Sequence, residues 1–263
     1  MSSLRQKLLS QNFLHNRKLV TRLVGRSSIG KKDLVLEIGP GRGIITRVLL
    51  EQAGHVVAVE LDAGLYQDLR QTFARQENLT LCHGDILSFP LSRLPYKVFA
   101  NIPFAIEGKI IRKLLEDDNP PQDCFLVVMR ELALRLANEQ GAGLFGARHR
   151  PWFEFTVEHA FKRSDFTPAP NVDAVLLRIQ RKKLPLLPFQ ERKKYWQFVR
   201  RAFGHGLPVK NNLKHFYGPD KVAAALHQLS LSRKIRPGEL TPEQWVKFYA
   251  KTQPYRSFKR VYN

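Results

Sequence analysis

The segment that most constrains the fold is a short apolar run that leads into three closely spaced glycines. The apolar run covers residues 34–38, the glycines are Gly39, Gly41 and Gly43, and a second aliphatic run begins at Ile44. This order predicts a buried parallel strand, a tight turn and the start of a helix. Glycine lets the backbone turn sharply and lets a ligand come close where a Cβ would block it. An ordinary glycine-rich strand-to-helix turn has the same pattern, so residues further along the chain must decide its function.

Strand-like and helix-like segments alternate through residues 1–180. The expected strands are 34–38, 55–60, 79–82, 96–100, 124–129, 151–157 and 172–179, and helices are expected at 43–52, 65–75, 107–115 and 131–139. Such alternation predicts an α/β sheet with mostly parallel strands and with ligands at their C-terminal ends. Gly39, Glu60, Asp85 and Asn101 all fall at those ends, as the residues of one site built from loops would.

The chain changes character at residue 181. A basic, proline-broken linker covers 181–188, and helical patterns follow at 190–203, 222–229 and 242–251. We therefore expect a catalytic domain at 1–180 and a small basic helical domain at 181–263, which ends in a tail with Arg256, Lys259 and Arg260.

The net charge of +20 is concentrated in that second part. Residues 181–263 hold 19 Lys and Arg against 4 Asp and Glu, whereas the first 180 residues carry only +5. A strong positive charge on one part of a chain points to a polyanionic partner, nucleic acid first and an anionic membrane second.

Cysteines, histidines and apolar runs set the expected surroundings. Cys82 and Cys124 are far apart, so free thiols in a reducing cytosol are expected. The eight histidines are scattered, so no metal site is expected, and no apolar run approaches the length of a membrane span. A cytoplasmic monomer is the expectation.

Glu60 and Asp85 are candidate cofactor ligands. A carboxylate 17 residues after Gly43 suits the two ribose hydroxyls of an adenosine, whether in NAD or in S-adenosyl-L-methionine. The glycines at alternate positions lack the final spacing that holds a pyrophosphate, which favours S-adenosyl-L-methionine. Asp85 could accept from the adenine amine, or it could cap the turn before Ile86.

The sequence Asn101-Ile102-Pro103-Phe104 carries the most specific chemistry. The lone pair of an exocyclic aromatic amine is delocalised into its ring, and a site can help by accepting both N–H groups. The side-chain oxygen of Asn101 and the carbonyl of Ile102 would do so, with Pro103 fixing the turn. Phe104 would stack on an extruded base. A simple turn with a core Phe is common for a lone tetrapeptide of this kind, but at the end of a fourth strand, downstream of Gly, Glu and Asp in this order, it is the minority interpretation.

Together these segments closely resemble the rRNA adenine N6-methyltransferases. The segments that carry the resemblance are Gln11-Asn12-Phe13-Leu14, residues 37–43, Glu60, Gly84-Asp85, Asn101-Ile102-Pro103-Phe104 and residues 166–173. The resemblance covers nearly the whole chain. It implies a Rossmann-like, S-adenosylmethionine-dependent methyltransferase domain with a small all-helical C-terminal domain.

Within that family the chain looks like the Erm branch, which methylates one adenine of 23S rRNA and confers macrolide–lincosamide–streptogramin B resistance. The other branch, KsgA, dimethylates adjacent adenines of small-subunit rRNA and usually has a Gly-x-Leu-Ser-Val stretch where this chain has residues 143–147. Residues 151–155 and 181–183 are more Erm-like. The expected partner is 23S rRNA, naked or in a precursor particle, and 16S rRNA is the alternative.

The resemblance also implies roles for single residues. Asn12 and Leu14 would touch the cofactor from an N-terminal arm, as would Gly39 and Gly41 from the turn and Asn101 beside the reacting centre. Phe166 would hold the target adenine opposite Phe104, where the family often has Tyr. RNA contacts are expected from Arg112, Lys113, Arg148, Arg150, Lys193, Lys194, Arg200 and Arg201, with Arg148 and Arg150 in a mobile loop.

Two other classes remain open. A non-catalytic nucleic-acid-binding relative would keep the fold, although the intact residues 101–104 argue against it. DNA adenine methyltransferases more often carry Asp/Asn-Pro-Pro-Tyr, which this chain lacks.

Overall fold

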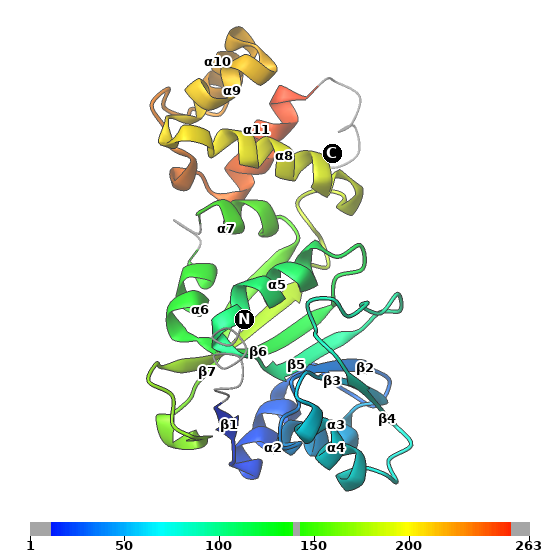
Figure 1. Ribbon diagram of the computed structural model, residues 1–263. Helices are drawn as coiled ribbons and strands as arrows, with labels where there is room; N and C mark the ends of the chain where they lie inside the picture. The colour runs from blue at the N-terminus through cyan, green and yellow to red at the C-terminus, as the bar shows by residue number, and fades with distance from the viewer. Residues whose placement is uncertain (1–11, 139–142, 254–263) are drawn as a thin grey trace. The chain divides into compact units, whose positions relative to one another are not determined.

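The computed structural model describes residues 12–138 and 143–253 of the chain (Figure 1). Gln11 of the arm and Arg256, Lys259 and Arg260 of the tail lie outside the described residues. The chain divides into two compact units, one of residues up to 133 together with 155–180, the other of residues 134–154 together with those from 181 onward.

A seven-stranded sheet forms the body of the first unit, in the order β4-β3-β2-β5-β6-β9-β7. The strands are β2 (Leu34–Ile38), β3 (His55–Glu60), β4 (Leu79–His83), β5 (Lys97–Asn101), β6 (Asp123–Met129), β7 (Phe153–Ala160) and β9 (Ala174–Arg181). Pairing is parallel from β4 through β6, and β9 runs antiparallel to β6. The mostly parallel sheet agrees with the sequence prediction. The apolar runs of β2, β5 and β6 became largely buried strands, whereas β4 and most of β7 stay partly or fully exposed.

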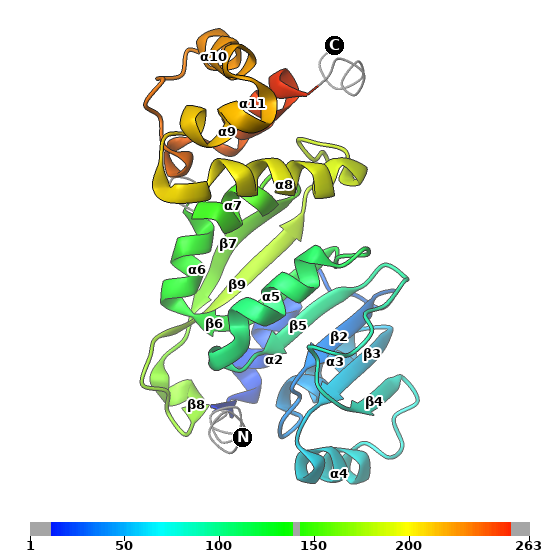
Figure 2. The same ribbon diagram turned by 45° about the horizontal axis from the view of Figure 1, so that its top comes forward.

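Helices cover both faces of this sheet. They are α2 (Arg17–Arg26), α3 (Ile44–Gln52), α4 (Ala63–Thr72) and α5 (Glu107–Glu116), while α6 (Arg130–Ala137) begins in this unit and ends in the second. Figure 2 shows α5 crossing the near face of the sheet, with α2 behind it. Asn16 caps α2 by accepting from the Leu19 N–H at 3.1 Å, and the apolar face of α2 is buried in the core.

A two-stranded ribbon fastens the N-terminal arm to the first unit. β1 (Phe13–Leu14) pairs antiparallel with β8 (Phe166–Thr167). The His15 N–H donates to the Asp165 carbonyl at 3.2 Å, and His15 Nε2 lies 2.8 Å from the Ser164 carbonyl oxygen. These contacts hold the arm at the sheet edge where β2 and β5 end.

The second unit is helical and packed around aromatic rings. Its helices are α7 (Gly143–His149), α8 (Arg192–Ala202), α9 (Val209–Tyr217), α10 (Pro219–Gln228) and α11 (Pro242–Thr252). The Phe198 ring centroid lies within 6.1 Å of those of Tyr217, Trp245, Phe248 and Tyr249. All three tryptophans of the chain, Trp152, Trp196 and Trp245, belong to this unit.

Three features differ from the sequence expectations. Residues 143–149 form α7, so the prediction of a mobile loop that includes Arg148 was wrong. Helix α9 was not predicted. The described residues 134–138 and 143–154 group with the C-terminal helices, whereas the expected boundary left them in the first domain. In the described part of the chain, no helix is long and apolar enough to span a membrane, and no three or more His, Cys, Asp or Glu side chains form a group that could hold a metal ion.

Candidate active site

The turn between β2 and α3 needs its glycines for two different reasons. Gly39, Gly41 and Gly43 have φ angles of +64°, +58° and +75°, which favour glycine. A Cβ on Gly43 would lie 2.7 Å from Cε2 of Phe73, at the end of α4, whereas a Cβ on Gly39 would meet no atom within 4 Å. Gly43 therefore allows close packing, and Gly39 borders open space.

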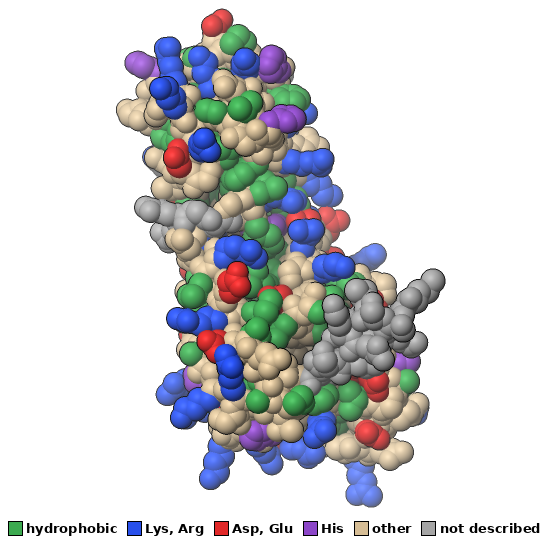
Figure 3. All heavy atoms as spheres, turned by 60° about the vertical axis from the view of Figure 1, so that its left-hand side comes forward, with side chains coloured by type: hydrophobic (Ala, Val, Ile, Leu, Met, Phe, Trp, Pro, Cys, Tyr) green, Lys and Arg blue, Asp and Glu red, His purple; other side chains and the backbone are tan. Residues whose placement is uncertain are grey.

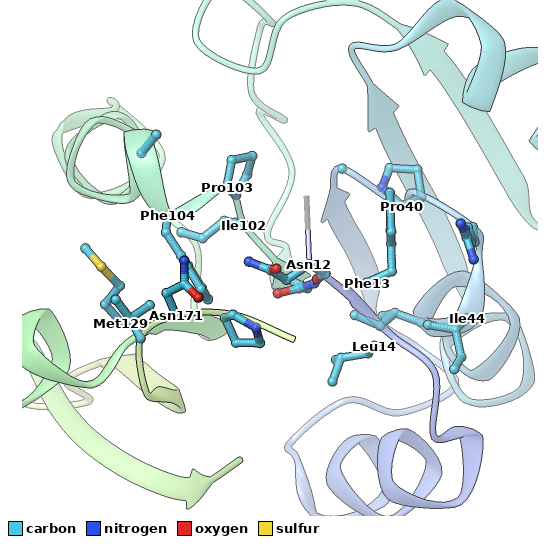
Figure 4. A pocket seen from close by; sticks show the side chains of 17 residues that line it. Asn12, Phe13, Leu14, Pro40, Ile44, Ile102, Pro103, Phe104, Met129 and Asn171 are labelled. Carbon is cyan, nitrogen blue, oxygen red and sulfur yellow. The ribbon is translucent and has the colours of Figure 1, made fainter. Parts of the chain in front are cut away.

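That open space consists of two cavities, and Gly39 and Pro103 line both. The larger has a volume of about 310 Å³ and the smaller about 30 Å³. Four segments supply the walls of the larger cavity: residues 12–14, the glycine turn with α3, residues 101–105, and the loop at 170–172 with Met129. Figure 4 shows Phe104, Met129 and Asn171 gathered on one side and Pro40, Phe13 and Ile44 on the other, with Asn12 between them.

The smaller cavity is lined by two of the predicted carboxylates. Glu60 Oε2 accepts from the Gly41 N–H at 3.0 Å, and Oε1 accepts from the Asp62 N–H at 2.9 Å. A carboxylate accepts at about four sites, so each oxygen keeps a free lone pair. Asp85 Oδ1 accepts from the Leu87 N–H at 2.8 Å, so Asp85 caps its turn as well as lining the cavity.

Asn101, at the end of β5, is oriented by the N-terminal arm. Its Nδ2 donates to the Asn12 carbonyl at 2.7 Å. Only the amino end of the amide can donate to a carbonyl, so Oδ1 is the acceptor that Asn101 offers to the larger cavity. The next residues follow as the turn Ile102–Pro103 and a short 3₁₀ helix, Phe104–Ile106.

Two further contacts fix the side of the cavity near Phe104. Buried Glu107 accepts from the Met129 N–H through Oε2 at 2.9 Å, which anchors the end of β6. The Arg130 N–H donates to the Asp173 carbonyl at 2.8 Å, which joins the same strand end to the loop that carries Asn171.

Comparisons with known proteins agree with this geometry. Residues 2–253 match the family model described as ribosomal RNA adenine dimethylase. The chain belongs to the ribosomal RNA adenine dimethylase family. It is 33% identical over 262 residues to the ribosomal RNA small subunit methyltransferase A of Nostoc sp., covering 92% of this chain and 96% of the relative. The enzyme of the same name from Lactococcus lactis is 31% identical over 258 residues, covering 92% and 88%.

Solved structures confirm the expected fold. The crystal structure of 23S rRNA methyltransferase ErmE is 27% identical with a TM-score of 0.78, covering 91% of this chain and 99% of that one. A dimethyladenosine transferase from Plasmodium falciparum shares the fold at 21% identity and a TM-score of 0.77, covering 90% of this chain and 95% of that one. The chain is thus a Rossmann-like methyltransferase of the rRNA adenine type.

Proteins of this family depend on S-adenosyl-L-methionine, and the two cavities fit it. The space in front of Gly39 is open where any Cβ would intrude. Glu60 would hold the ribose hydroxyls with its remaining lone pairs, and Asp85 would meet the adenine amine. Asn12, Leu14 and Asn101 line the larger cavity, where the methionine part and the transferable methyl would lie. Gly41 lines neither of these two cavities and would act through Glu60, to which its N–H donates.

Phe166 was predicted to hold the target adenine, and the structure contradicts this role. It is 3% exposed, belongs to the hydrophobic core, and packs edge-on against Phe161 with ring centroids 5.4 Å apart. Its pairing with Leu14 in the two-stranded ribbon turns the ring inward. The side chains beside Phe104 are instead Met129, Asn171 and Val172, of which Met129 lies outside every segment that carries the family resemblance.

The predicted RNA-binding residues have very different surroundings. Arg150 is buried and its Nη2 donates to the Leu136 carbonyl, so its assignment to RNA was wrong. Arg148 is half-buried, with its guanidinium carbon 4.8 Å from the Trp196 ring centroid. The side chains of Arg112, Lys193, Lys194, Arg200 and Arg201 are exposed, and that of Lys113 is half-buried.

Arg42 and Met129 line the cavity but were not singled out from the sequence. Arg42 carries its guanidinium 5.1 Å from the Phe13 ring centroid, which adds a cation beside the arm. The glycine spacing could have drawn attention to Arg42, because it lies inside the turn. No local pattern marks Met129, whose position depends on where β6 ends beside the loop at 170–172.

Proposed function

We propose that this protein methylates the N6 amine of adenine in small-subunit ribosomal RNA. The hydrogen bond of Asn101 carries the chemical part of this proposal: Nδ2 is held by the Asn12 carbonyl, which leaves Oδ1 as the acceptor of a side chain that lines the cavity. The choice of RNA is supported by relatives that share 31–33% identity along nearly their whole length and are named small subunit methyltransferases.

The residues at the end of β5 suit an amine that attacks poorly. Accepting both N–H groups, at Asn101 Oδ1 and the Ile102 carbonyl, favours the pyramidal nitrogen whose lone pair is available. Bound S-adenosyl-L-methionine would supply an activated methyl group. The new ammonium loses its proton readily, so no strong base is needed. Positioning by Pro103 and stacking on Phe104 then account for most of the catalysis.

A large-subunit target is the second candidate. The similarity to ErmE, at 27% identity over 99% of that chain, favours methylation of 23S rRNA, with macrolide resistance as its consequence. The local sequence supports it too, since residues 143–147 read Gly-Leu-Phe-Gly-Ala rather than the stretch usual in the small-subunit branch.

Primer extension across 16S and 23S rRNA tests both candidates. The rRNA is incubated with the protein and S-adenosyl-L-methionine, and Asn101→Ala is run beside the wild type after circular dichroism has shown that it folds. Stops in 16S rRNA that disappear with Asn101→Ala are the expected result. A stop in 23S rRNA alone would favour the second candidate. Because N6-monomethyladenine still pairs and gives no stop, methyl-labelled S-adenosyl-L-methionine is used in parallel, and neither a stop nor a labelled methyl in either RNA would contradict the proposal.

A further inference from the structure

Helices α8 and α9 lie in a stretch of sequence that contains Lys and Arg but no acidic residue. Residues 192–217 contain seven Lys and Arg and no Asp or Glu, and the flanking acids are Glu191 and Asp220. Glu191 is partly engaged, because its Oε2 accepts from the Tyr249 hydroxyl at 3.0 Å. Figure 3 shows Lys, Arg and His side chains on one face of the helical unit, with hydrophobic side chains between them. Such a surface attracts a polyanion.

An exposed aromatic ring lies within this surface. Phe216, in the last turn of α9, is 56% exposed although it is a large apolar side chain. The guanidinium carbon of Arg201 is 4.6 Å from its ring centroid. Arg201 Nη1 also donates to the Tyr217 hydroxyl at 3.2 Å, and Tyr217 packs on buried Phe198 with ring centroids 5.4 Å apart. These contacts hold the Arg201 guanidinium beside the Phe216 ring.

We propose that Arg201, Phe216 and Tyr217, here called the α9 platform, bind an unpaired base of single-stranded RNA. Aromatic rings and Arg guanidinium planes stack on bases of any identity, and neighbouring cations hold the phosphates. The base bound there is distinct from the adenine at Phe104. This inference rests on the proposed function only for the source of the RNA, which is the ribosomal RNA substrate.

The chemistry of the α9 platform favours single-stranded over double-stranded RNA. Bases in an A-form duplex are already stacked on their neighbours and present only edges, so they cannot cover the Phe216 face. A purely electrostatic surface would bind both forms through phosphates and would not require the ring. Discrimination by strandedness therefore separates the α9 platform from the surrounding positive charge.

Binding without S-adenosyl-L-methionine tests the proposal. The full-length protein is titrated with a single-stranded oligoribonucleotide of about ten nucleotides that contains a fluorescent adenine analogue, and with its duplex. Phe216→Leu keeps an apolar side chain but removes the ring, and Phe216→Trp keeps a ring. Leu207→Ala, at a residue 46% exposed in the same unit, is the matched control.

Phe216→Leu is expected to weaken single-strand binding about tenfold and to reduce quenching of the analogue, with duplex affinity unchanged. Phe216→Trp should restore both, and Leu207→Ala should match the wild type. Equal losses for both RNA forms, or no loss in Phe216→Leu, would overturn the proposal. Because no methyl transfer is measured, the α9 platform can fail while the methylation assay succeeds, and the reverse.

Discussion

Glu37, in β2, and Glu60, at the end of β3, are buried carboxyl groups that interact with each other but have different surroundings. Glu60 accepts two backbone N–H groups. The Glu37 side chain is 1% exposed, and Thr46 is the polar neighbour that favours its charged form. Burial, together with the nearby Glu60 charge, raises the pKa of Glu37 to about 8, and Thr46 offsets this only in part. We therefore expect Glu37 to be largely protonated at neutral pH.

Glu37→Gln should change how stability depends on pH. In the wild type the folded state keeps a proton that the unfolded state releases above a pKa of 4.5, so this group contributes less stability as pH rises from there to about 8. Glutamine does not titrate. The stability of Glu37→Gln relative to the wild type should rise by about 3 kcal/mol between about pH 5 and pH 8.

Denaturant unfolding at both pH values measures this difference, with Glu77→Gln, at an exposed carboxyl, as the control. A constant difference between the Glu37→Gln and wild-type curves would mean that Glu37 is ionised in the fold.

Phe104 should contribute through its ring face rather than through polarity. Phe104→Leu is expected to lower kcat/KM for rRNA about tenfold to a hundredfold, because stacking on an extruded base is lost. Phe104→Tyr keeps the ring and should stay within a few-fold of the wild type. Steady-state methylation rates check both variants, and a fully active leucine variant would exclude stacking at this position.

At the scale of elements, the glycine turn between β2 and α3 predicts different results for two similar substitutions. Gly43→Ala places a methyl 2.7 Å from a Phe73 ring carbon at a φ of +75°, so it should destabilise the fold by about 2–4 kcal/mol. Gly39→Ala meets no neighbour within 4 Å and should cost only about 1–2 kcal/mol. Its methyl enters the cavities, so the affinity for S-adenosyl-L-methionine should fall more than tenfold.

Denaturant unfolding and calorimetric titration separate these effects. If Gly39→Ala binds the cofactor normally, the space in front of this glycine is not the cofactor site.

The helices that sequence reasoning missed depend on distant partners. Residues 143–149 contain two glycines and end in Arg148 and His149, which is typical of a loop. These residues are nevertheless helical, and side chains distant in the sequence donate to the carbonyls at the end of the helix. The Tyr195 hydroxyl donates to the Ala147 carbonyl, and Trp196 Nε1 donates to the Arg148 carbonyl. α9 begins after Pro208 and is anchored by buried Asn212, which donates to the Ala202 and Leu207 carbonyls.

The strands and the glycine turn were predictable because their signals are local. The period of the apolar residues, the apolar runs and the glycine spacing can each be recognised within about ten residues of sequence. They predicted that Gly39, Glu60, Asp85 and Asn101 lie at one edge of the sheet. The Phe166 error has the opposite origin. Which way its side chain points depends on the pairing of β8 with the arm, which no local pattern encodes.

For the whole molecule, RNA affinity should depend on how many positively charged side chains are exposed. RNA affinity is expected to fall steeply with salt, and Arg200→Ala, at an exposed side chain on α8, should reduce the slope of log affinity against log salt by about one. Arg150→Ala should leave this slope unchanged and lower the stability by about 2 kcal/mol, because it removes the donor to the buried Leu136 carbonyl. Filter binding over a salt series, with unfolding curves for both variants, checks this contrast. A reduced slope in Arg150→Ala would instead show that Arg150 contributes to RNA binding.

The placement of the tryptophans gives the molecule a natural optical label. Trp152, Trp196 and Trp245 all lie in the helical unit, while Tyr66 and Tyr96 are the described tyrosines of the methyltransferase unit. Indole emission therefore follows the unfolding of one unit alone, whereas far-ultraviolet ellipticity follows both. A cofactor bound beside Gly39 that shifts the ellipticity midpoint and leaves the indole midpoint in place would identify two independent folding units, and a joint shift would measure the free energy that couples them.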